Sequence, residues 1–334
     1  MQFSSLTAKR WQVFLRNKIA VVSLSILAVS LVCSLLSEWI ANDRPYILRF
    51  QGKTYFPILF QPSAQELGVT DSFSVEYKKL PLQAGDWAVY PPVAFNPFQS
   101  NEKLTQFPGP PSSENILGTD DRGRDVFARL LYGFRISFGY ALGTWLMTYL
   151  IGAVLGLSMG YFGGSVDFIG QRLVEVLNSV PQFFLLIILI SIFEPSLVLL
   201  ILITSTFGWI PISYYIRAEG LRLRKLEFVE AARALGLPKW KIILKHVLPN
   251  ALTPIVTFSP FAIAAGITGL AALDYLGFGL APPTPSWGEL LNQAKKHFTN
   301  AWWLAFFPSA AIFFTLSCLS FVGEGLRNAF DPKQ

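Results

Sequence analysis

Long apolar runs separated by short polar segments dominate the pattern of this chain. A helix needs about 20 apolar residues to cross the roughly 30 Å hydrocarbon core of a bilayer. Six segments reach this length, and they cover residues 19–40, 134–161, 173–193, 197–216, 251–273 and 302–322. The pattern therefore predicts an all-α polytopic membrane protein with six transmembrane helices.

The apolar runs also predict how the chain is divided. We expect a tail over residues 1–18, a first transmembrane helix over 19–40, an insert over 41–133, a five-helix core over 134–326 with a polar loop over 217–250, and a tail over 327–334. The insert is proline-rich and too polar to enter lipid, so it is predicted to be ordered but irregular. Residues 125–132 predict a short amphipathic helix at its end. The first apolar run is too long for a signal peptide, so we expect a retained anchor.

Glycine recurs at every fourth position in the second predicted span. The set comprises Gly152, Gly156, Gly160 and Gly164, with a further pair at Gly139 and Gly143. Small residues at this spacing allow the backbones of two membrane helices to approach closely. We therefore predict tight helix packing here, and not a ligand site.

Composition and charge support the assignment to a membrane. Hydrophobic residues make up 52% of the chain and charged residues only 14%, whereas soluble domains carry about 25% charged residues. The basic residues behind the net charge of +6 lie between apolar runs and form no stripe, which argues against a nucleic-acid binder. Lys and Arg are enriched in short cytosolic loops, so both termini are predicted to be cytosolic.

The polar loop between the fourth and fifth spans carries the most informative motif. It contains Glu-Ala-Ala at residues 230–232, Gly236, nine further residues, and then His-Val-Leu-Pro at 246–249. Residues 229–235 predict a short helix with Ala231 and Ala232 on one face, where a partner could dock closely. Gly236 permits the turn that ends this helix, and the Leu-Pro pair at 237–238 can begin another.

This loop resembles the EAA loop of ABC importer permeases, Glu-Ala-Ala-x3-Gly-x9-Ile-x-Leu-Pro, with a departure at the Ile position. His246 stands at the departing position. The coupling loop implied by the resemblance comprises Glu230, Ala231, Ala232, Gly236, Leu237, His246, Leu248 and Pro249. The resemblance implies a type I ABC importer permease fold and a loop that couples the chain to a separate ATPase.

Further segments are similar to oligopeptide and dipeptide permeases. They cover residues 14–18, 117–126, 276–279 and 325–332, and shorter strings at 40–45 and 55–57 resemble the second permease of Yej-type systems, which are associated with peptides and microcin C. This resemblance implies a multi-pass inner-membrane protein of bacteria. It also implies a second permease as heterodimer partner, cytosolic ATP-binding subunits that hold ATP and magnesium, and a periplasmic peptide-binding protein.

The chain itself is predicted to be non-catalytic and to hold no cofactor or metal. Gly52-Lys53-Thr54 ends like a phosphate-binding loop, but Ile47 stands at the position of its first glycine. His246 and His297 fall on opposite predicted sides of the membrane, so they cannot ligate one metal together.

Ionisable residues near membrane depth are costly and are therefore candidates for a transport path. Asp274 follows the fifth span, and Glu175 with Asn178 lies in the third. The main alternative is an ion-coupled secondary transporter without an ATPase, which predicts buried ionisable pairs and broken helices near the midplane. A membrane scaffold or signalling protein is a third possibility that stays open at this point.

Overall fold

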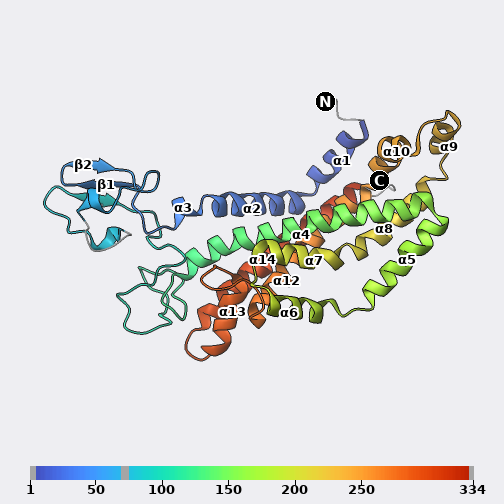
Figure 1. The fold of residues 1–334 in the computed structure, drawn as a ribbon. Coiled ribbons are helices and arrows are strands. Elements are labelled where there is room, and N and C mark those ends of the chain that lie inside the picture. The colour runs from blue at the N-terminus through green and yellow to red at the C-terminus, as the bar shows by residue number, and fades with distance from the viewer. Residues whose placement is uncertain (1–4, 69–74, 331–334) are drawn as a thin grey trace.

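A computed structural model describes residues 5–68 and 75–330 of the chain. Most helices form one elongated bundle, and the strands of the insert lie beyond one end of it (Figure 1). The predicted C-terminal tail lies outside the described residues from position 331 onward. The last two positions of the motif at 325–332 therefore also lie outside them. Residues 327–330 of that tail continue the last helix instead of leaving it.

The structure has the following elements in chain order. The helices are α1 (Ser5–Arg16), α2 (Lys18–Leu35), α3 (Ser37–Ile40), α4 (Val126–Phe162), α5 (Gly164–Asn178), α6 (Gln182–Ile192), α7 (Leu197–Gly208), α8 (Ile210–Leu223), α9 (Glu227–Ala234), α10 (Lys239–Ile242), α11 (Leu248–Ala251), α12 (Thr253–Leu276), α13 (Trp287–Lys296) and α14 (Trp302–Phe330). A π-helical turn spans Ile243–Val247, and short 3-10 turns span Gln65–Leu67 and Tyr77–Lys79. The strands are β1 (Ile47–Phe50), β2 (Lys53–Tyr55) and β3 (Trp87–Val89).

Within the described residues, four helices are long and apolar enough to cross a membrane unaided, namely α2, α4, α12 and α14. The pairs α5–α6 and α7–α8 pass the same test together, but they are bent by 69° and 45°. Counting each bent pair as one span gives the six predicted transmembrane segments. Proline explains both breaks: Pro181 precedes α6, and Pro211 occupies the first turn of α8, where its missing N–H costs nothing.

The long helix α4 is the axis of the bundle and packs most closely against α8. An added Cβ at Gly160 would lie 2.4 Å from the Arg217 carbonyl oxygen, and one at Gly156 would lie 2.6 Å from the Ser213 carbonyl oxygen. A Cβ added at Gly152 would lie 2.4 Å from the Ile212 side chain of α8, so these three glycines form the predicted close-packing stripe. Gly164 does not belong to it, because it begins α5 with φ of +51°.

The insert contains a small antiparallel sheet in the order β2-β1-β3. The hairpin between β1 and β2 turns at Gln51 and Gly52, which both have positive φ, as expected for a tight two-residue hairpin. Leu48, Phe50 and Leu67 are buried beneath it. The hydrophobic pattern does not predict these strands, because runs of three or four residues are too short to display a period-2 alternation.

The insert leads directly into α4. Asp125 caps the helix by accepting a hydrogen bond from the Ala128 amide at 2.8 Å, and its other oxygen accepts from Asn115 at 2.9 Å. The amphipathic helix predicted over residues 125–132 is therefore the first two turns of α4. The helix continues through Gly133, where the absence of a side chain lets Trp287 pack against the backbone.

Candidate functional site

A cavity of about 440 Å³ opens between α4, α7, α8 and α12. Its walls combine aromatic rings with threonine hydroxyls, and no lining residue in the described part of the chain is charged. The principal lining residues are Tyr140, Thr144, Trp145, Thr148, Tyr149, Thr204, Tyr215, Phe258 and Phe261. Gly266 and Gly269 of α12 complete the wall, and a Cβ added at Gly269 would meet open space.

Polar groups in the cavity wall are held in place by one another. The Tyr140 and Thr204 hydroxyls lie 2.8 Å apart, and the Trp145 indole N–H donates to the Ser259 hydroxyl at 2.8 Å. These bonds join α4 to α7 and α12. The result is a largely apolar, uncharged surface with a few hydroxyl groups, which can contact amide groups and apolar side chains without selecting for charge.

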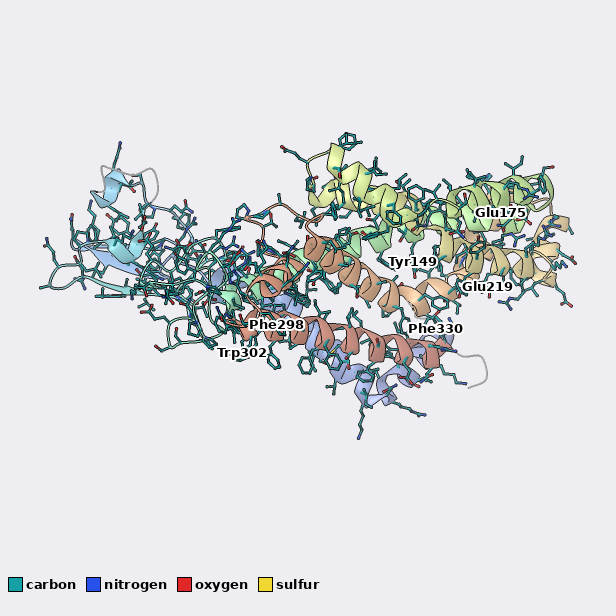
Figure 2. The ribbon with its side chains drawn as sticks, turned by 90° about the horizontal axis from the view of Figure 1, so that it is seen from below. Tyr149, Glu175, Glu219, Phe298, Trp302 and Phe330 are labelled. Atoms are coloured by element: carbon teal, nitrogen blue, oxygen red, sulfur yellow. The ribbon has the colours of Figure 1, made fainter. Side chains whose placement is uncertain are left out.

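The predicted pathway residues do not line this cavity. Glu175 and Asn178 are exposed on α5, and the Glu175 carboxylate pairs with Arg172 at 2.6 Å, away from Tyr149 of the cavity wall (Figure 2). Asp274 lies in the last turn of α12, not after the span, and is buried. Its carboxylate accepts hydrogen bonds from the Leu280 amide at 2.7 Å and from the Ser286 hydroxyl, so it holds the turn that follows α12.

The predicted coupling loop forms a compact projection at the end of the bundle opposite the strands (Figure 1). Val229 and Ala232 on α9 are buried in a cluster with Ile242 and Val247, which fixes the projection to the bundle. The opposite face of α9 is exposed and consists of two glutamates and two alanines, Glu227, Glu230, Ala231 and Ala234. The prediction that Ala231 and Ala232 share a face is wrong, because consecutive helical residues point about 100° apart.

The turn after α9 has the geometry that its sequence requires. Gly236 has φ of +72°, which residues with a side chain rarely adopt, and its amide donates to the Arg233 carbonyl at 3.0 Å. The Leu237 amide donates to the Ala232 carbonyl at 3.2 Å, which completes a typical helix C-terminal motif. Leu235 is 81% exposed at this turn, so a large apolar side chain stands in the open beside the acidic face of α9.

The remaining motif residues lie where the projection returns to the bundle. Leu237, His246 and Leu248 are half-buried, and Pro249 is exposed. Leu237 and Leu248 pack against the cluster that also holds α9. At the same end of the bundle, Arg217 on α8 forms a two-pronged ion pair with Asp167 on α5, with N–O distances of 2.5 and 2.7 Å. The projection is therefore linked through α8 to both bent spans.

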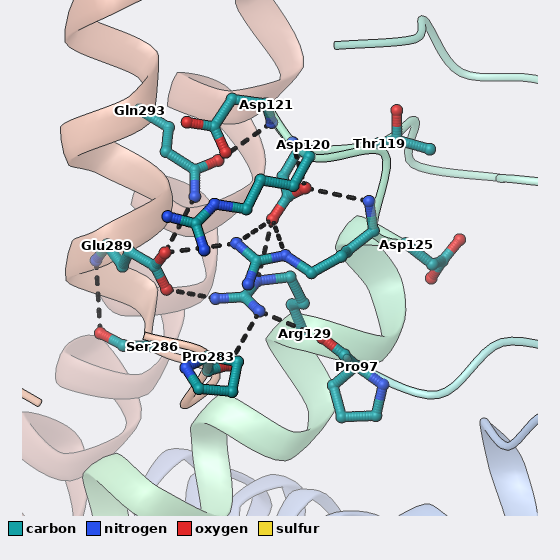
Figure 3. A network of polar contacts seen from close by, with 12 residues as sticks. Pro97, Thr119, Asp120, Asp121, Asp125, Arg129, Pro283, Ser286, Glu289 and Gln293 are labelled. Atoms are coloured by element: carbon teal, nitrogen blue, oxygen red, sulfur yellow. Dashed lines mark hydrogen bonds and ion pairs between the residues drawn. The ribbon is translucent and has the colours of Figure 1, made fainter. Parts of the chain in front are cut away.

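A buried ionic network lies at the other end of the bundle (Figure 3). Arg129 of α4 has no exposed side-chain surface and pairs with Asp120 at 3.3 Å and with Glu289 of α13. Arg124 donates to Asp120 at 2.7 Å and to Glu289 at 3.3 Å. The network thus ties the last loop of the insert and the start of α4 to α13, a helix more than 150 residues away in sequence.

Asp121 borders this network without being neutralised by it. Burial raises the pKa of the Asp121 carboxyl, and the charge of Asp120 acts in the same direction against the attraction of Arg124 and Arg122. The backbone amide of Asp121 is hydrogen-bonded, because it donates to the Gln293 side-chain oxygen at 3.3 Å. The Asp120–Arg124 pair is local, but the contacts to Glu289 could not be predicted from the sequence because they form only when α4 packs on α13.

Comparison with known proteins identifies the family. Residues 152–334 match the family described as binding-protein-dependent transport system inner membrane component. The chain belongs to this family. Residues 5–62 additionally match the N-terminal transmembrane domain of oligopeptide transport permease C.

Curated relatives extend the similarity over the whole chain. The inner membrane ABC transporter permease protein YejE of Escherichia coli is 40% identical over 338 residues, which cover 100% of this chain and 99% of that protein. The peptidoglycan transport system permease protein YejE of Agrobacterium fabrum is 34% identical, covering 99% and 94%. The oligopeptide permease OppC of Haemophilus influenzae is 35% identical over 66% of this chain and 70% of its own.

These similarities confirm the predicted membership among oligopeptide- and dipeptide-type ABC permeases and the predicted type I ABC importer permease fold. The chain is a multi-pass membrane permease of an ABC importer, which implies ATPase and binding-protein partners and is consistent with the inner membrane. The secondary-transporter alternative is excluded by family membership. Its expected broken helices do occur at α5–α6 and α7–α8, so bent spans alone do not distinguish the two classes.

Proposed function

We propose that this chain forms one half of the pathway of an ATP-driven peptide importer and receives its driving motion through α9. The supporting observation is the two-sided structure of α9. Its inner residues Val229 and Ala232 are fixed in the bundle, whereas its outer face of Glu227, Glu230 and Ala231 is exposed. A rigid element with one anchored face and one open face is suited to passing the movement of a docked subunit to the spans.

The proposed partners follow from this arrangement. ATP and magnesium would be held by separate ATPase subunits, which dock on α9 and Leu235 from the cytosol, where both termini of this chain would lie. A second, different permease would complete the wall of the half-open cavity, and a periplasmic binding protein would deliver the substrate. The chain would perform no covalent chemistry and would bind no cofactor.

Peptide is the substrate class that the relatives' names and the cavity support together. Relatives include oligopeptide and dipeptide permeases, and the walls here offer hydroxyls and aromatic rings without charge. Such a surface tolerates peptides of varied sequence, because every peptide carries amide groups whereas side-chain charges differ.

Replacing Ala231 with Arg tests the docking proposal. Because Ala231 is exposed on the outer face of α9, the larger charged side chain should block close docking without disturbing the bundle. We expect tagged wild-type chain, co-expressed with the neighbouring genes, to recover both a second permease and an ATPase, and Ala231→Arg to recover the second permease alone.

The matched control is Ala84→Arg, which places the same side chain at an exposed alanine of the insert. It should recover both partners at the wild-type level. If Ala231→Arg still recovered the ATPase, α9 would not be the docking element. The same conclusion would follow if both variants lost the ATPase equally. Failure of wild type to recover any nucleotide-binding subunit would count against the coupled importer as a whole.

Filling the cavity should stop transport without unfolding the chain. A side chain at Gly269 would enter open space within the cavity, so Gly269→Phe is expected to reduce peptide uptake to background while thermal stability is unchanged. Gly139→Phe is the control, because a side chain at Gly139 also meets open space but lies outside the cavity. Normal uptake by Gly269→Phe would show that peptide does not pass through this cavity.

A further inference from the structure

The first helix, α1, is basic and carries exposed apolar side chains. It contains Lys9, Arg10 and Arg16 and no acidic residue, and Lys18 follows at the start of α2. Trp11 and Leu15, one helical turn apart, are 55% and 47% exposed. Since α2 is the first transmembrane segment and begins immediately after Asn17, α1 lies at the boundary of the bilayer.

Packing holds α1 in a defined position against the last helix, α14. Phe14 is 2% exposed and packs with Ala20 and Ala329. A Cβ added at Gly325 would lie only 2.4 Å from the Ala20 side chain and 3.1 Å from the Phe14 ring, so the absence of a side chain there permits this contact. The basic residues of α1 are therefore presented by a fixed helix and not by a free tail.

An apolar cavity of about 620 Å³ lies between α1, α14 and the first turn of α12. Trp11, Val256, Leu326 and Phe330 contribute apolar walls, and Arg10 is the charged residue at its edge. Phe330 lies at the end of α14 (Figure 2). The Arg10 guanidinium lies over its ring, 4.5 Å from the ring centroid. Stacking leaves the donors at the edge of the guanidinium free to face outward.

We propose that this cavity binds an anionic phospholipid, with the phosphate held by Arg10 and an acyl chain inside the apolar walls. The arginine at the cavity edge matches the anionic headgroup of such a lipid, and the apolar walls match its acyl chain. The helix that carries the arginine lies at the bilayer boundary, where such lipids are found. Lys9 and Arg16 are exposed on the same helix and add attraction for anionic headgroups. Each basic residue near an anionic membrane surface strengthens binding about fivefold.

The occupied cavity lies between α14 and α12, and α12 follows directly on the coupling projection through α11. The lipid would therefore brace the same end of the bundle on which the ATPase is proposed to act. The lipid site itself requires only the membrane-spanning fold and does not depend on that docking proposal.

The test measures lipid binding to the purified full chain in detergent by native mass spectrometry. Phosphatidylglycerol and phosphatidylcholine with identical acyl chains are compared as probes. We expect wild type to retain phosphatidylglycerol preferentially. Arg10→Gln should weaken phosphatidylglycerol binding about fivefold, and the triple variant Lys9→Gln/Arg10→Gln/Arg16→Gln about a hundredfold. Binding of phosphatidylcholine should fall less in both, because its choline ammonium group offsets the charge of its phosphate.

A triple variant with the same loss of charge at the same end of the bundle, Lys239→Gln/Lys241→Gln/Lys245→Gln, is the control and should bind phosphatidylglycerol as wild type does. Equal binding of the two lipids by wild type, or equal losses in the two triple variants, would overturn the proposal. Competition by glycerol 3-phosphate alone would also overturn it, because it would indicate a site for a free phosphate group.

Discussion

Replacing Gly160 with Leu should destabilise the permease more than any other single change in α4 that adds only apolar atoms. A Cβ at this position would lie 2.4 Å from the Arg217 carbonyl and 3.0 Å from the Gly220 Cα. These are backbone atoms of α8, which cannot rotate away, so the two helices must separate. Overpacking of this kind costs about 1–3 kcal/mol or more, and loss of the close contact also weakens the dispersion attraction that holds membrane helices together.

Thermal loss of the monodisperse fraction in detergent, followed by size-exclusion fluorescence, measures this effect. Gly139→Leu on the same helix is the control, because nothing lies within 4 Å of a Cβ added there. The control should be at least as stable as wild type, because leucine is a better helix former than glycine. If Gly160→Leu were as stable as Gly139→Leu, the close contact between α4 and α8 would not exist in the folded protein.

The second large effect is expected from Arg129→Met in the buried network. Removing the guanidinium leaves the Asp120 and Glu289 carboxylates with less compensation, and it also removes donors to the Pro97 and Pro283 carbonyls at 3.1 and 3.3 Å. Breaking a buried ion pair by deleting one partner costs about 3–5 kcal/mol. We expect a strongly lowered thermal midpoint and rapid proteolysis of the loop at residues 118–125.

Arg129→Lys distinguishes charge from geometry. It keeps the positive charge but loses the planar fork that reaches several acceptors at once, so it should recover only part of the stability. Arg172→Met is the control: its ion pair with Glu175 is solvent-exposed on both sides and should contribute no more than about 1 kcal/mol. Similar midpoints for Arg129→Met and Arg172→Met would refute a structural role of the network.

The sequence predicted the features that depend on short stretches of chain. The length of an apolar run decides whether a helix can cross the bilayer, so the four unbroken spans could be located, and the other two predicted segments overlap the bent pairs. Gly236 marks the end of α9 because a positive φ is a local requirement. The glycine spacing in α4 predicted close packing, although which helix would fill the contact could not be read from it.

The size of the bends and the short strands were not predicted, for physical reasons. Prolines in membrane helices are tolerated and often mark kinks, so Pro181 and Pro211 indicated where bends could occur, but not that two spans would break by 69° and 45°. The strands of the insert are three or four residues long, and their pairing is decided by the hairpin at Gln51 and by the cluster around Leu48.

The sequence by itself determined that this chain crosses a membrane several times and carries a loop with the spacing of the EAA motif, because hydrophobic length and motif spacing are local properties. Only the tertiary structure decided which side chains line the cavity. That outcome depends on the rotation of α4, α7, α8 and α12 about their axes, and it selects uncharged residues such as Tyr140 and Thr204. Asp274 was expected to face the path, but it is bonded to Ser286, twelve positions further along the chain, and that contact exists only once α12 and α13 have packed together.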